Sequence, residues 1–512
     1  MRTSLITYIF GLLVIMAVVV EGITIPLDHP VYESVDYLSN SGFLPGLQRQ
    51  VKPYDLRVVN DELKRINPTN FSPVQFLYYQ DAMAYLDKAS KGSQENNLLL
   101  DAHLKAVASS ADTFSYHSRL HVGAAYTYKR FSLVNRVAVD ATNEKDRYDH
   151  LERKYNKKMA ADMPQAYLQY HGDKWGLLAG RNQVKWGPGM SGNLMLGDHM
   201  PPLNQVLLWG NFGFLKGYTL SSRLTPTDSV TSRYFSASRL VISLKKNLYI
   251  ALNQSVVYAG AGRNFEMHYV IPSFIYYFGT FGFALKNKTE NLLVGADGEW
   301  NIRNKYRLYF EFLADDFQVD RDTRSRTTQN AIAWLVGLDC PNLYKGMDAG
   351  FEYYRANSYV YKNSGGFPVY YIANLHGGVI GHEIGPDAEA LQVNIAKRWK
   401  RHLNSGLRYS LVRRGDLNSV YGIWDAHGKA DEAIPHGVVC SEHTLVGEAG
   451  FIHFNGFSIS GNVGYHWFVN KSNVLDNDNS GVVWQVGLQY YFDRLLQWNT
   501  RSTLFALTSP RR

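Results

Sequence analysis

Apolar and polar residues alternate with a period of two through most of the chain beyond residue 97. The clearest segments are 306–315, 347–353, 457–467 and 484–492. Segments of about ten residues with one apolar and one polar face are typical of strands in transmembrane β-barrels. A soluble β-sandwich shows the same alternation, so the pattern alone leaves both architectures open.

The connections between the predicted strands separate the two architectures. From residue 232 onward, short connections alternate with long ones. The short connections are 245–247, 302–304, 341–345, 400–402 and 454–455, and the long ones are 259–290, 316–329, 357–388, 414–442 and 469–480. Short turns at one end and long loops at the other are typical of outer-membrane barrels. The sequence therefore predicts an all-β transmembrane barrel of antiparallel strands.

The number of strands depends on the stretch between residues 184 and 213. The alternation alone predicts 17 strands, whereas single-chain bacterial barrels normally have an even number. A further strand at 204–210, followed by a tight turn at Asn211-Phe212, restores an even count. We predict about 18 strands, with 16 as the alternative.

The residues before the barrel have a different pattern. Residues 1–22 contain Arg2 and then an uncharged apolar run, which predicts a cleaved signal peptide and export. Helical spacing, helix-stop signals and a capping box then predict three short helices, within 30–42, 55–66 and 72–88. The predicted organisation is a signal peptide at 1–22, a helical module at 23–97, a barrel at 98–492 and a C-terminal tail of uncertain structure at 493–512.

Composition narrows the classes of function. The 512 residues are 45% hydrophobic and 14% aromatic, which excludes a disordered chain, and no second apolar run indicates a helical membrane protein. The formal net charge of +8 suits anionic glycans or lipopolysaccharide as neighbours. No basic block interleaved with aromatic residues indicates nucleic acid. Cys340 and Cys440 lack the spacing of a metal site, and we expect two free thiols.

Three motifs occur in order along nearly the whole chain. The first is Pro26-Leu27-Asp28-His29-Pro30-Val31-Tyr32, with Gly42-Phe43-Leu44 and Lys52-Pro53-Tyr54 after it. The second is Gly180-Arg181 and Trp186-Gly187-Pro188-Gly189, followed by Gly192-Asn193-Leu194-Met195-Leu196 and Pro201-Pro202. The third is Gly381-His382-Glu383-Ile384-Gly385-Pro386-Asp387-Ala388. Together they resemble the Wzi family of capsule-assembly proteins of Gram-negative outer membranes.

The resemblance implies an 18-stranded outer-membrane barrel with a periplasmic helical bundle at its inner mouth and long loops outside the cell. It also implies a lectin-like role in which the protein retains capsular or other surface polysaccharide. One departure is the C-terminus, because barrels often end on an aromatic residue and here Asp493 to Arg512 follow Phe492.

Several motifs have both a chemical and a structural interpretation. The Trp186-Gly187-Pro188-Gly189 motif fits a compact turn folded into the barrel mouth, with sugar stacking by Trp186 as the alternative. His382-Glu383 lacks the second histidine of a zinc protease, because Pro386 stands in its place. Inward carboxylates are interpreted as lumen lining rather than as a glycosidase pair; they are Asp297, Glu299, Glu311, Asp348, Glu352 and Glu448. The sequence predicts no catalytic residue, metal or cofactor.

The long loops are the predicted place of carbohydrate binding, since binding residues concentrate on loops held by a rigid scaffold. Aromatic rings offer a flat surface to sugars and arginine binds carboxylates in a bidentate way. The candidate residues are Tyr359, Tyr361, Tyr370 and Tyr371 on loop 357–388, with Arg414 and Trp424 on loop 414–442. The alternative is that these aromatic residues pack the loops over the mouth.

Three functions remain on sequence grounds. The favoured hypothesis is a non-enzymatic barrel, expected as a monomer, that holds surface polysaccharide through many weak contacts. The second is a porin or solute channel. The third is an outer-membrane hydrolase, which no motif supports.

Overall fold

The computed structural model describes most of the chain. The described residues are 23–90, 97–110, 114–142, 153–156, 159–197, 199–226, 231–271, 275–282, 290–316, 330–362, 371–372, 379–400, 402–419, 433–452 and 456–497. The predicted signal peptide at 1–22 lies outside these residues. Within them, no helix is long and apolar enough to cross a membrane.

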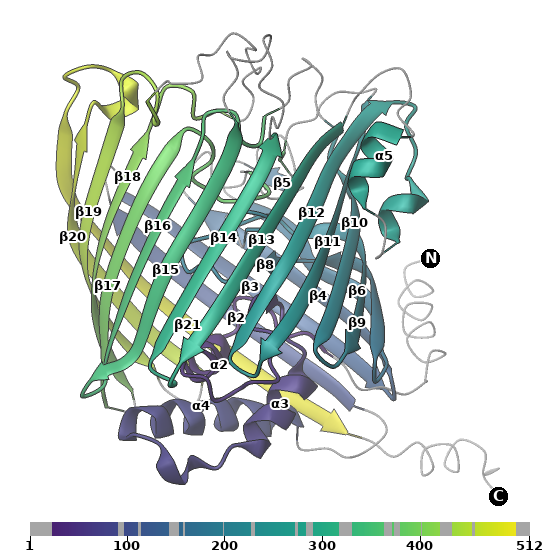
Figure 1. Ribbon diagram of the computed structural model, residues 1–512. Helices are drawn as coiled ribbons and strands as arrows, with labels where there is room; N and C mark the ends of the chain where they lie inside the picture. The colour runs from purple at the N-terminus through teal and green to yellow at the C-terminus, as the bar shows by residue number, and fades with distance from the viewer. Residues whose placement is uncertain are drawn as a thin grey trace, which may run out of the picture.

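Antiparallel strands form the wall of a closed barrel (Figure 1). The strands are β2 (Asn97–Ser110), β3 (Phe114–Tyr128), β4 (Phe131–Thr142), β5 (Arg153–Asn156), β6 (Met159–His171), β7 (Trp175–Asn182), β9 (Leu203–Phe212), β10 (Leu215–Leu224), β11 (Thr231–Lys245), β12 (Leu248–Ala261), β13 (Glu290–Ile302), β14 (Tyr306–Asp316), β15 (Ala331–Tyr344), β16 (Met347–Ala356), β17 (Ala388–Lys400), β18 (Leu403–Arg414), β19 (Cys440–Ile452), β20 (Phe457–Val469) and β21 (Asn479–Gln497).

Pairing of the first and last strands closes the barrel. Asn97 to Ser110 of β2 pair with Gln497 to Trp484 of β21. Strand β5 is a short addition to β6, and β4 pairs directly with β6, so 18 strands within the described residues make up the wall. The predicted count of 18 is confirmed.

Two boundaries differ from the sequence prediction. Asn211 and Phe212 still pair with Lys216 and Leu215, so the tight turn falls on Gly213-Phe214 instead of Asn211-Phe212. Gly213 has a φ of +80°, a left-handed conformation that glycine adopts without strain. At the other end of the chain, β21 continues past Phe492 to Gln497.

The two faces of the wall have opposite character. Apolar side chains on the outer face are exposed, among them Leu252, Phe310, Leu407 and Val463. The inner face carries many polar side chains, with buried ion pairs such as Arg239–Asp297 and Arg136–Asp101, and an apolar cluster on β9 to β16. An apolar exterior around a polar interior is the arrangement of a membrane-spanning barrel.

The barrel has a short-turn end and a loop end. Connections of a few residues, such as Lys246-Asn247 between β11 and β12, lie at the end where the N-terminal helices sit (Figure 1). The long connections join strands at the opposite end. Cys340 and Cys440 are both free and buried, as expected.

The N-terminal module consists of helices α2 (Val31–Asn40), α3 (Leu56–Arg65) and α4 (Pro73–Ser90). Asp55 caps α3 by accepting a hydrogen bond from the backbone N–H of Arg57 at 2.9 Å. Ser72 and Gln75 form the capping box of α4, with the Ser72 N–H donating to Gln75 at 2.9 Å. The helices share an apolar core of their own that includes Val35, Leu38, Val59, Leu63 and Leu86.

The module is fastened inside the short-turn mouth by polar contacts. Its two-residue strand β1 (Val51–Lys52) pairs with β8 (Lys185–Trp186), which belongs to the β7–β9 connection. Asp55 contacts His171 of β6 at 3.0 Å, and the Asn40 amide donates to Asp339 of β15 at 3.1 Å. The module is therefore docked at this mouth and attached to the wall.

Candidate functional site

The connection between β7 and β9, residues 183–202, folds inward and fills part of the barrel. Trp186 is 1% exposed, and Leu194 and Leu196 pack in the same apolar cluster. This cluster also contains inward side chains of β9 to β16, including Leu220, Phe235, Leu313 and Leu335. The compact-turn interpretation of the Trp186-Gly187-Pro188-Gly189 motif fits this arrangement, because the buried indole presents no face to a sugar.

Two wall carboxylates hold this inner loop. Glu311 accepts hydrogen bonds from the backbone N–H of Gly189 at 3.1 Å and of Leu194 at 2.7 Å. Glu352 accepts from the N–H groups of Met190 at 2.6 Å and Ser191 at 2.8 Å. Carboxylates that receive backbone amides in this way bind the loop and have no access to a glycosidic bond.

The described residues of loop 357–388, which are 357–362, 371–372 and 379–388, pack against the inner loop, and we call the two loops together the plug. The rings of Tyr361 and Tyr371 stack 5.5 Å apart, and the Tyr361 hydroxyl donates to the Leu194 carbonyl at 2.8 Å. Tyr371 hydrogen-bonds to Ser255 of β12. Both rings are fully buried, and Tyr359 is 4% exposed. In this conformation the three tyrosines pack the loop, so the stacking role predicted for them has no accessible ring.

His382 is part of the same packing. Its ring stacks on Tyr354 at 4.0 Å, and a Cβ atom at Gly192 would lie only 2.7 Å from its Nε2. Gly192 is thus required where the two loops touch. The histidine contacts an aromatic ring and a backbone, which is a structural role.

Asp387 joins two loops at the loop end. Its carboxylate accepts from the Ser358 hydroxyl at 2.9 Å, from the Leu417 N–H at 3.0 Å and from the His436 N–H at 2.8 Å. Asp387 is fully buried. It was present in the third sequence motif, but the motif gave no sign that it would connect loop 357–388 to loop 414–442.

Lys362 strengthens the same junction. Its ammonium group donates to the Leu417 carbonyl at 2.6 Å. Burial lowers the pKa of Lys362 to about 8, although the negative charges of Asp387 and Asp416 act in the opposite direction. The partly desolvated lysine therefore connects loop 357–388 to loop 414–442 through this hydrogen bond.

Arg414 differs from the buried tyrosines. It lies at the loop end of β18 on the lumen side of the wall and pairs with Glu442 at 3.1 Å. Each of the two side chains is 33% exposed. Tyr370 and Trp424 lie outside the described residues, so Arg414 is the accessible member among the described candidates.

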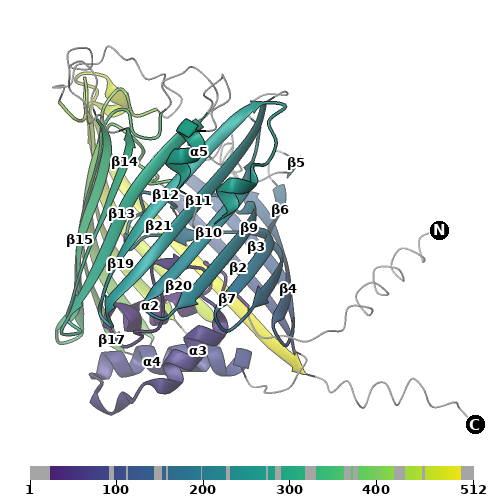
Figure 2. The ribbon, with the colours of Figure 1, turned by 45° about the vertical axis from the view of Figure 1, so that its right-hand side comes forward.

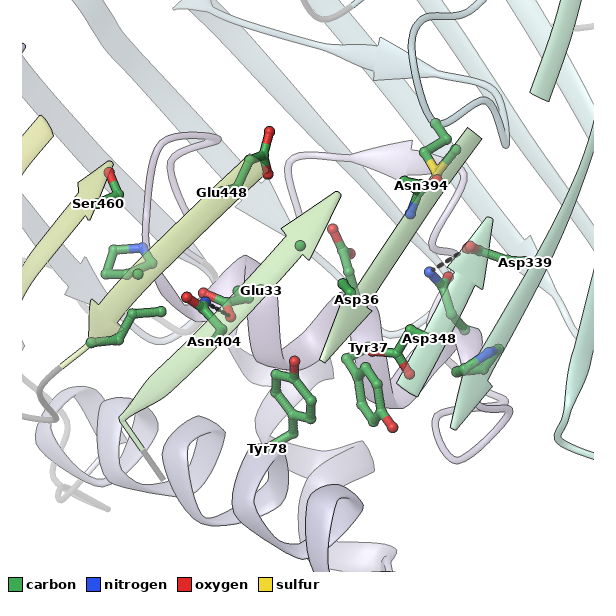
Figure 3. Close-up of a pocket in the computed structure, with 18 of the residues that line it drawn as sticks. Glu33, Asp36, Tyr37, Tyr78, Asp339, Asp348, Asn394, Asn404, Glu448 and Ser460 are labelled. Carbon is green, nitrogen blue, oxygen red and sulfur yellow. Dashed lines mark hydrogen bonds between the residues drawn. The ribbon is translucent and has the colours of Figure 1, made fainter. Parts of the chain in front are cut away.

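The lumen beside β16 to β20 stays open. A cavity of about 910 Å³ lies between the module and this side of the wall. Figure 3 shows carboxylates and amides pointing into it, and these include Glu33, Asp36, Asp348, Asn394, Asn404 and Glu448. Arg408 and Glu448 form a lumen ion pair at 2.7 Å, with 46% and 41% of their side chains exposed. One side of the lumen is thus filled by packed loops, and a cavity lined by polar residues lies on the other.

One group of residues has the composition of a metal site. The Nδ1 atoms of His103 and His121 lie 3.0 and 2.9 Å from the same oxygen of Asp28. The guanidinium of Arg136 lies 3.7 Å from the other oxygen, where it would repel a cation. A hydrogen bond between the His103 imidazole and Asp28 and the close contact of the His121 imidazole with the same oxygen account for the geometry. The cluster is a latch between the module and strands β2 and β3.

The electrostatics of this latch favour an ionised Asp28. Burial works against ionisation, but the close contacts with His103 and His121 and the charge of Arg136 outweigh it. Together they hold the pKa of Asp28 well below its usual range.

Comparisons with known proteins agree with this architecture. The family model for the capsule assembly protein Wzi matches residues 110–480. The solved structure of Wzi from Escherichia coli, described as an outer-membrane protein involved in group 1 capsule assembly and a carbohydrate-binding β-barrel, has a TM-score of 0.64. It is 13% identical, and the match covers 92% of this chain and 99% of that one.

The solved structure of OccD3 from Pseudomonas aeruginosa is more distant. OccD3 has a TM-score of 0.45 at 11% identity, with 79% of this chain and 92% of that chain covered. None of the curated proteins compared with the chain matches it.

Proposed function

We propose, because this chain belongs to the capsule assembly protein Wzi family, that it is an outer-membrane carbohydrate-binding barrel that retains capsular or other surface polysaccharide on the cell. The observation that carries this proposal is the family match. The structure adds a barrel in which the loops and the helical module are fixed to the wall. The inner loop, loop 357–388 and the helical module are all tied to the wall by hydrogen bonds and apolar packing.

The plug argues against the alternative of a diffusion channel. The two loops pack against β9 to β16, and the module lies across the short-turn mouth. Hydrogen bonds from the inner-loop backbone to Glu311 and Glu352 hold this loop inside the lumen, where it occupies space that a wide water-filled pore would leave free. The cavity of about 910 Å³ beside β16 to β20 is the place where any residual conductance would arise.

We place the helical module in the periplasm and the long loops outside the cell. The support is the sorting of short turns to the module end and long loops to the other, which matches the usual orientation of outer-membrane barrels. In this orientation the junction organised by Asp387 faces the surface where polysaccharide would be held.

The proposed glycan contacts are Arg414, Tyr370 and Trp424. Arg414 offers an accessible guanidinium beside Glu442, which suits a sugar carboxylate flanked by hydroxyl groups. Tyr359, Tyr361 and Tyr371 would act indirectly by fixing the shape of loop 357–388. Binding along a repeating polymer would multiply individually weak contacts.

Lipopolysaccharide is proposed as a lateral neighbour. On the outer face of the wall, Glu389 pairs with Arg355 at 2.6 Å and with Arg413 at 2.8 Å. These residues lie at the loop ends of β16, β17 and β18, and their register places them on the same face as the exposed Ile395 and Leu407. Two arginines around one carboxylate leave a positive charge for lipid phosphates.

We propose no enzymatic role. Among the described lumen carboxylates, Glu311 and Glu352 are engaged by backbone amides, and Asp297 by Arg239. A hydrolase would need an acid and a base that reach a substrate.

The decisive experiment is the distribution of polysaccharide between cells and medium in a deletion strain and its complemented parent. Retention predicts an unchanged total amount with a shift into the medium on deletion. An unchanged distribution would overturn the proposal, and steps of open-channel current in planar bilayers would then favour the channel.

A further inference from the structure

The outer wall of the barrel changes character on β11 and β12. Near the short-turn end its outward side chains are apolar and exposed, as Leu240, Ile250 and Leu252 show. Farther toward the loop end the same face carries polar and phenolic groups, namely Tyr234, Ser236, Ser238, Gln254 and Tyr258. Polar groups facing lipid are costly unless they are covered and hydrogen-bonded.

An arm of the β12–β13 connection covers this polar area from outside. The arm contains the 3₁₀-helix η2 (Met267–Val270) and helix α5 (Tyr276–Gly282). Figures 1 and 2 both place α5 against the outer side of the wall near β11 and β12. Ser236, Val256 and Tyr258 are fully buried as a result, and Ser238 is 7% exposed.

Specific contacts fix the arm in this position. The backbone N–H of Tyr276 donates to the Gln254 side chain at 2.9 Å, and Gln254 in turn donates to Ser238 at 2.8 Å. The rings of Tyr258 and Tyr269 lie 5.0 Å apart, and those of Tyr269 and Tyr276 lie 5.1 Å apart. The inner side of the arm is thus a small aromatic core, shared with the outer wall.

The opposite side of the arm is apolar and uncovered. Met267 is 69% exposed and Phe278 is 59% exposed. The other exposed apolar residues of the arm are Phe265, Ile271, Ile275 and Tyr277. On the wall beside the arm, Leu252 and Val294 are also exposed and apolar, and Val294 pairs with Gln254, which the arm contacts.

The depth of the arm fits the membrane. Gln254 lies six residues beyond Leu248, the first residue of β12. At about 3.3 Å per residue and a tilt of about 40°, this places the contact roughly 15 Å above the short-turn end of the strand. The apolar band of such barrels is about 25 Å tall, so the arm lies beside the half of the band nearest the loops.

We propose that residues 262–271 and 275–282 form a lipid-immersed arm, and that the exposed face of η2 and α5 contacts the acyl chains of the membrane leaflet at the loop end. The arm covers a polar stretch of the outer wall and presents an apolar surface to the membrane in its place. It also widens the barrel's contact with that leaflet on one side. The proposal depends on the barrel spanning a membrane and is independent of glycan binding.

Nitroxide accessibility tests the arm directly. Single cysteines replace Met267 or Phe278 in a Cys340→Ser/Cys440→Ser background, and the labelled full chain is reconstituted in phosphatidylcholine–phosphatidylglycerol vesicles. Leu252→Cys on the wall is the lipid-facing control, and Asp476→Cys in the exposed β20–β21 loop is the water-facing control. Collisions with oxygen report lipid, and collisions with a polar nickel chelate report water.

Immersion predicts labels at 267 and 278 that collide several-fold more with oxygen than with the chelate, as at 252. Labels that behave like the one at 476 would place the arm in water and overturn the proposal. Low collision with both reagents would mean that protein, such as a second copy, covers the face, and would also overturn it. Retention of the electrophoretic mobility of the folded barrel verifies each variant.

Discussion

Ser191 donates both its backbone N–H, at 2.8 Å, and its side-chain hydroxyl to one carboxylate oxygen of Glu352. The two residues are 161 positions apart in the chain. This contact joins the second sequence motif to the wall of the barrel and holds the inner loop inside the lumen. Since Glu352 is nearly fully buried, its ionic hydrogen bonds are little screened by water.

Replacement of Glu352 by Gln should loosen the inner loop. The amide cannot accept at both positions, so one buried N–H loses a partner, at about 2 kcal/mol. If cleavage follows the open population, such a loss raises the rate of proteolysis within residues 183–202 by roughly 30-fold. Glu448→Gln is the control, because its pair with Arg408 is exposed and should matter little. Equal cleavage of the two variants would contradict the role assigned to Glu352.

Replacement of Asp387 by Asn should uncouple the loops at the loop end. The side-chain amide would direct a donor toward some of the groups that now donate to Asp387, namely Ser358, Leu417 and His436. A local loss on the order of 2 kcal/mol should increase hydrogen exchange in residues 415–419 and 433–439 by tens of fold. Asp416→Asn is matched in charge and is expected to have a smaller effect, because that side chain is 45% exposed.

Much of the architecture could be predicted from the sequence because most strands carry their own local signal. Alternation with period two located 17 strands, the need for an even number located the one at 204–210, and loop lengths indicated the two ends. The turn was predicted two residues before Gly213-Phe214, because the pairing of β9 with β10 continues through Asn211 and Phe212.

The roles of loop residues were not predictable in the same way. A tyrosine-rich loop has the same composition whether its rings face sugar or a packed lumen. Tyr361 becomes a packing residue through its contact with Leu194, 167 positions away. Glu352 and Asp387 likewise obtain their roles from partners that only the folded chain brings near.

Tyr361→Phe separates packing from glycan binding. Loss of the hydroxyl leaves the buried Leu194 carbonyl without this donor and should destabilise the plug by about 1 kcal/mol. Proteolysis of loop 357–388 should rise roughly fivefold, whereas binding of purified polysaccharide to the intact protein should be unchanged. A loss of binding without any change in proteolysis would restore Tyr361 as a binding residue.

Arg414→Ala should weaken binding of an acidic polysaccharide. Removal of one accessible guanidinium costs about 1 kcal/mol per engaged site, which is roughly a fivefold loss for a short oligosaccharide. Lys345→Ala removes the same charge from a short turn at the module end and is the matched control. The measurement is calorimetric titration at low and high salt, and equal affinities for the two variants would remove Arg414 from the proposed site.

Acidification should release the helical module through Asp28. The folded-state pKa of Asp28 lies below its ordinary value because of His103, His121 and Arg136. A lowered pKa means that the contribution of Asp28 is complete above about pH 4 and is lost as the pH falls through the folded-state value. Fluorescence transfer between labels at Lys64 in the module and Lys129 in the β3–β4 turn measures the separation.

In the native latch we expect the transfer efficiency to stay constant from pH 7 to about pH 4 and to fall below it. Asp28→Asn should lower the efficiency already at pH 7 and remove this contribution to the acid transition, because the two imidazoles and Arg136 lose the anion they share. Asp36→Asn is the control, since Asp36 bonds to Lys52 and Tyr54 inside the module. A fall in efficiency of the unmodified chain well above about pH 4, where Asp28 is still ionised, would contradict the role assigned to Asp28.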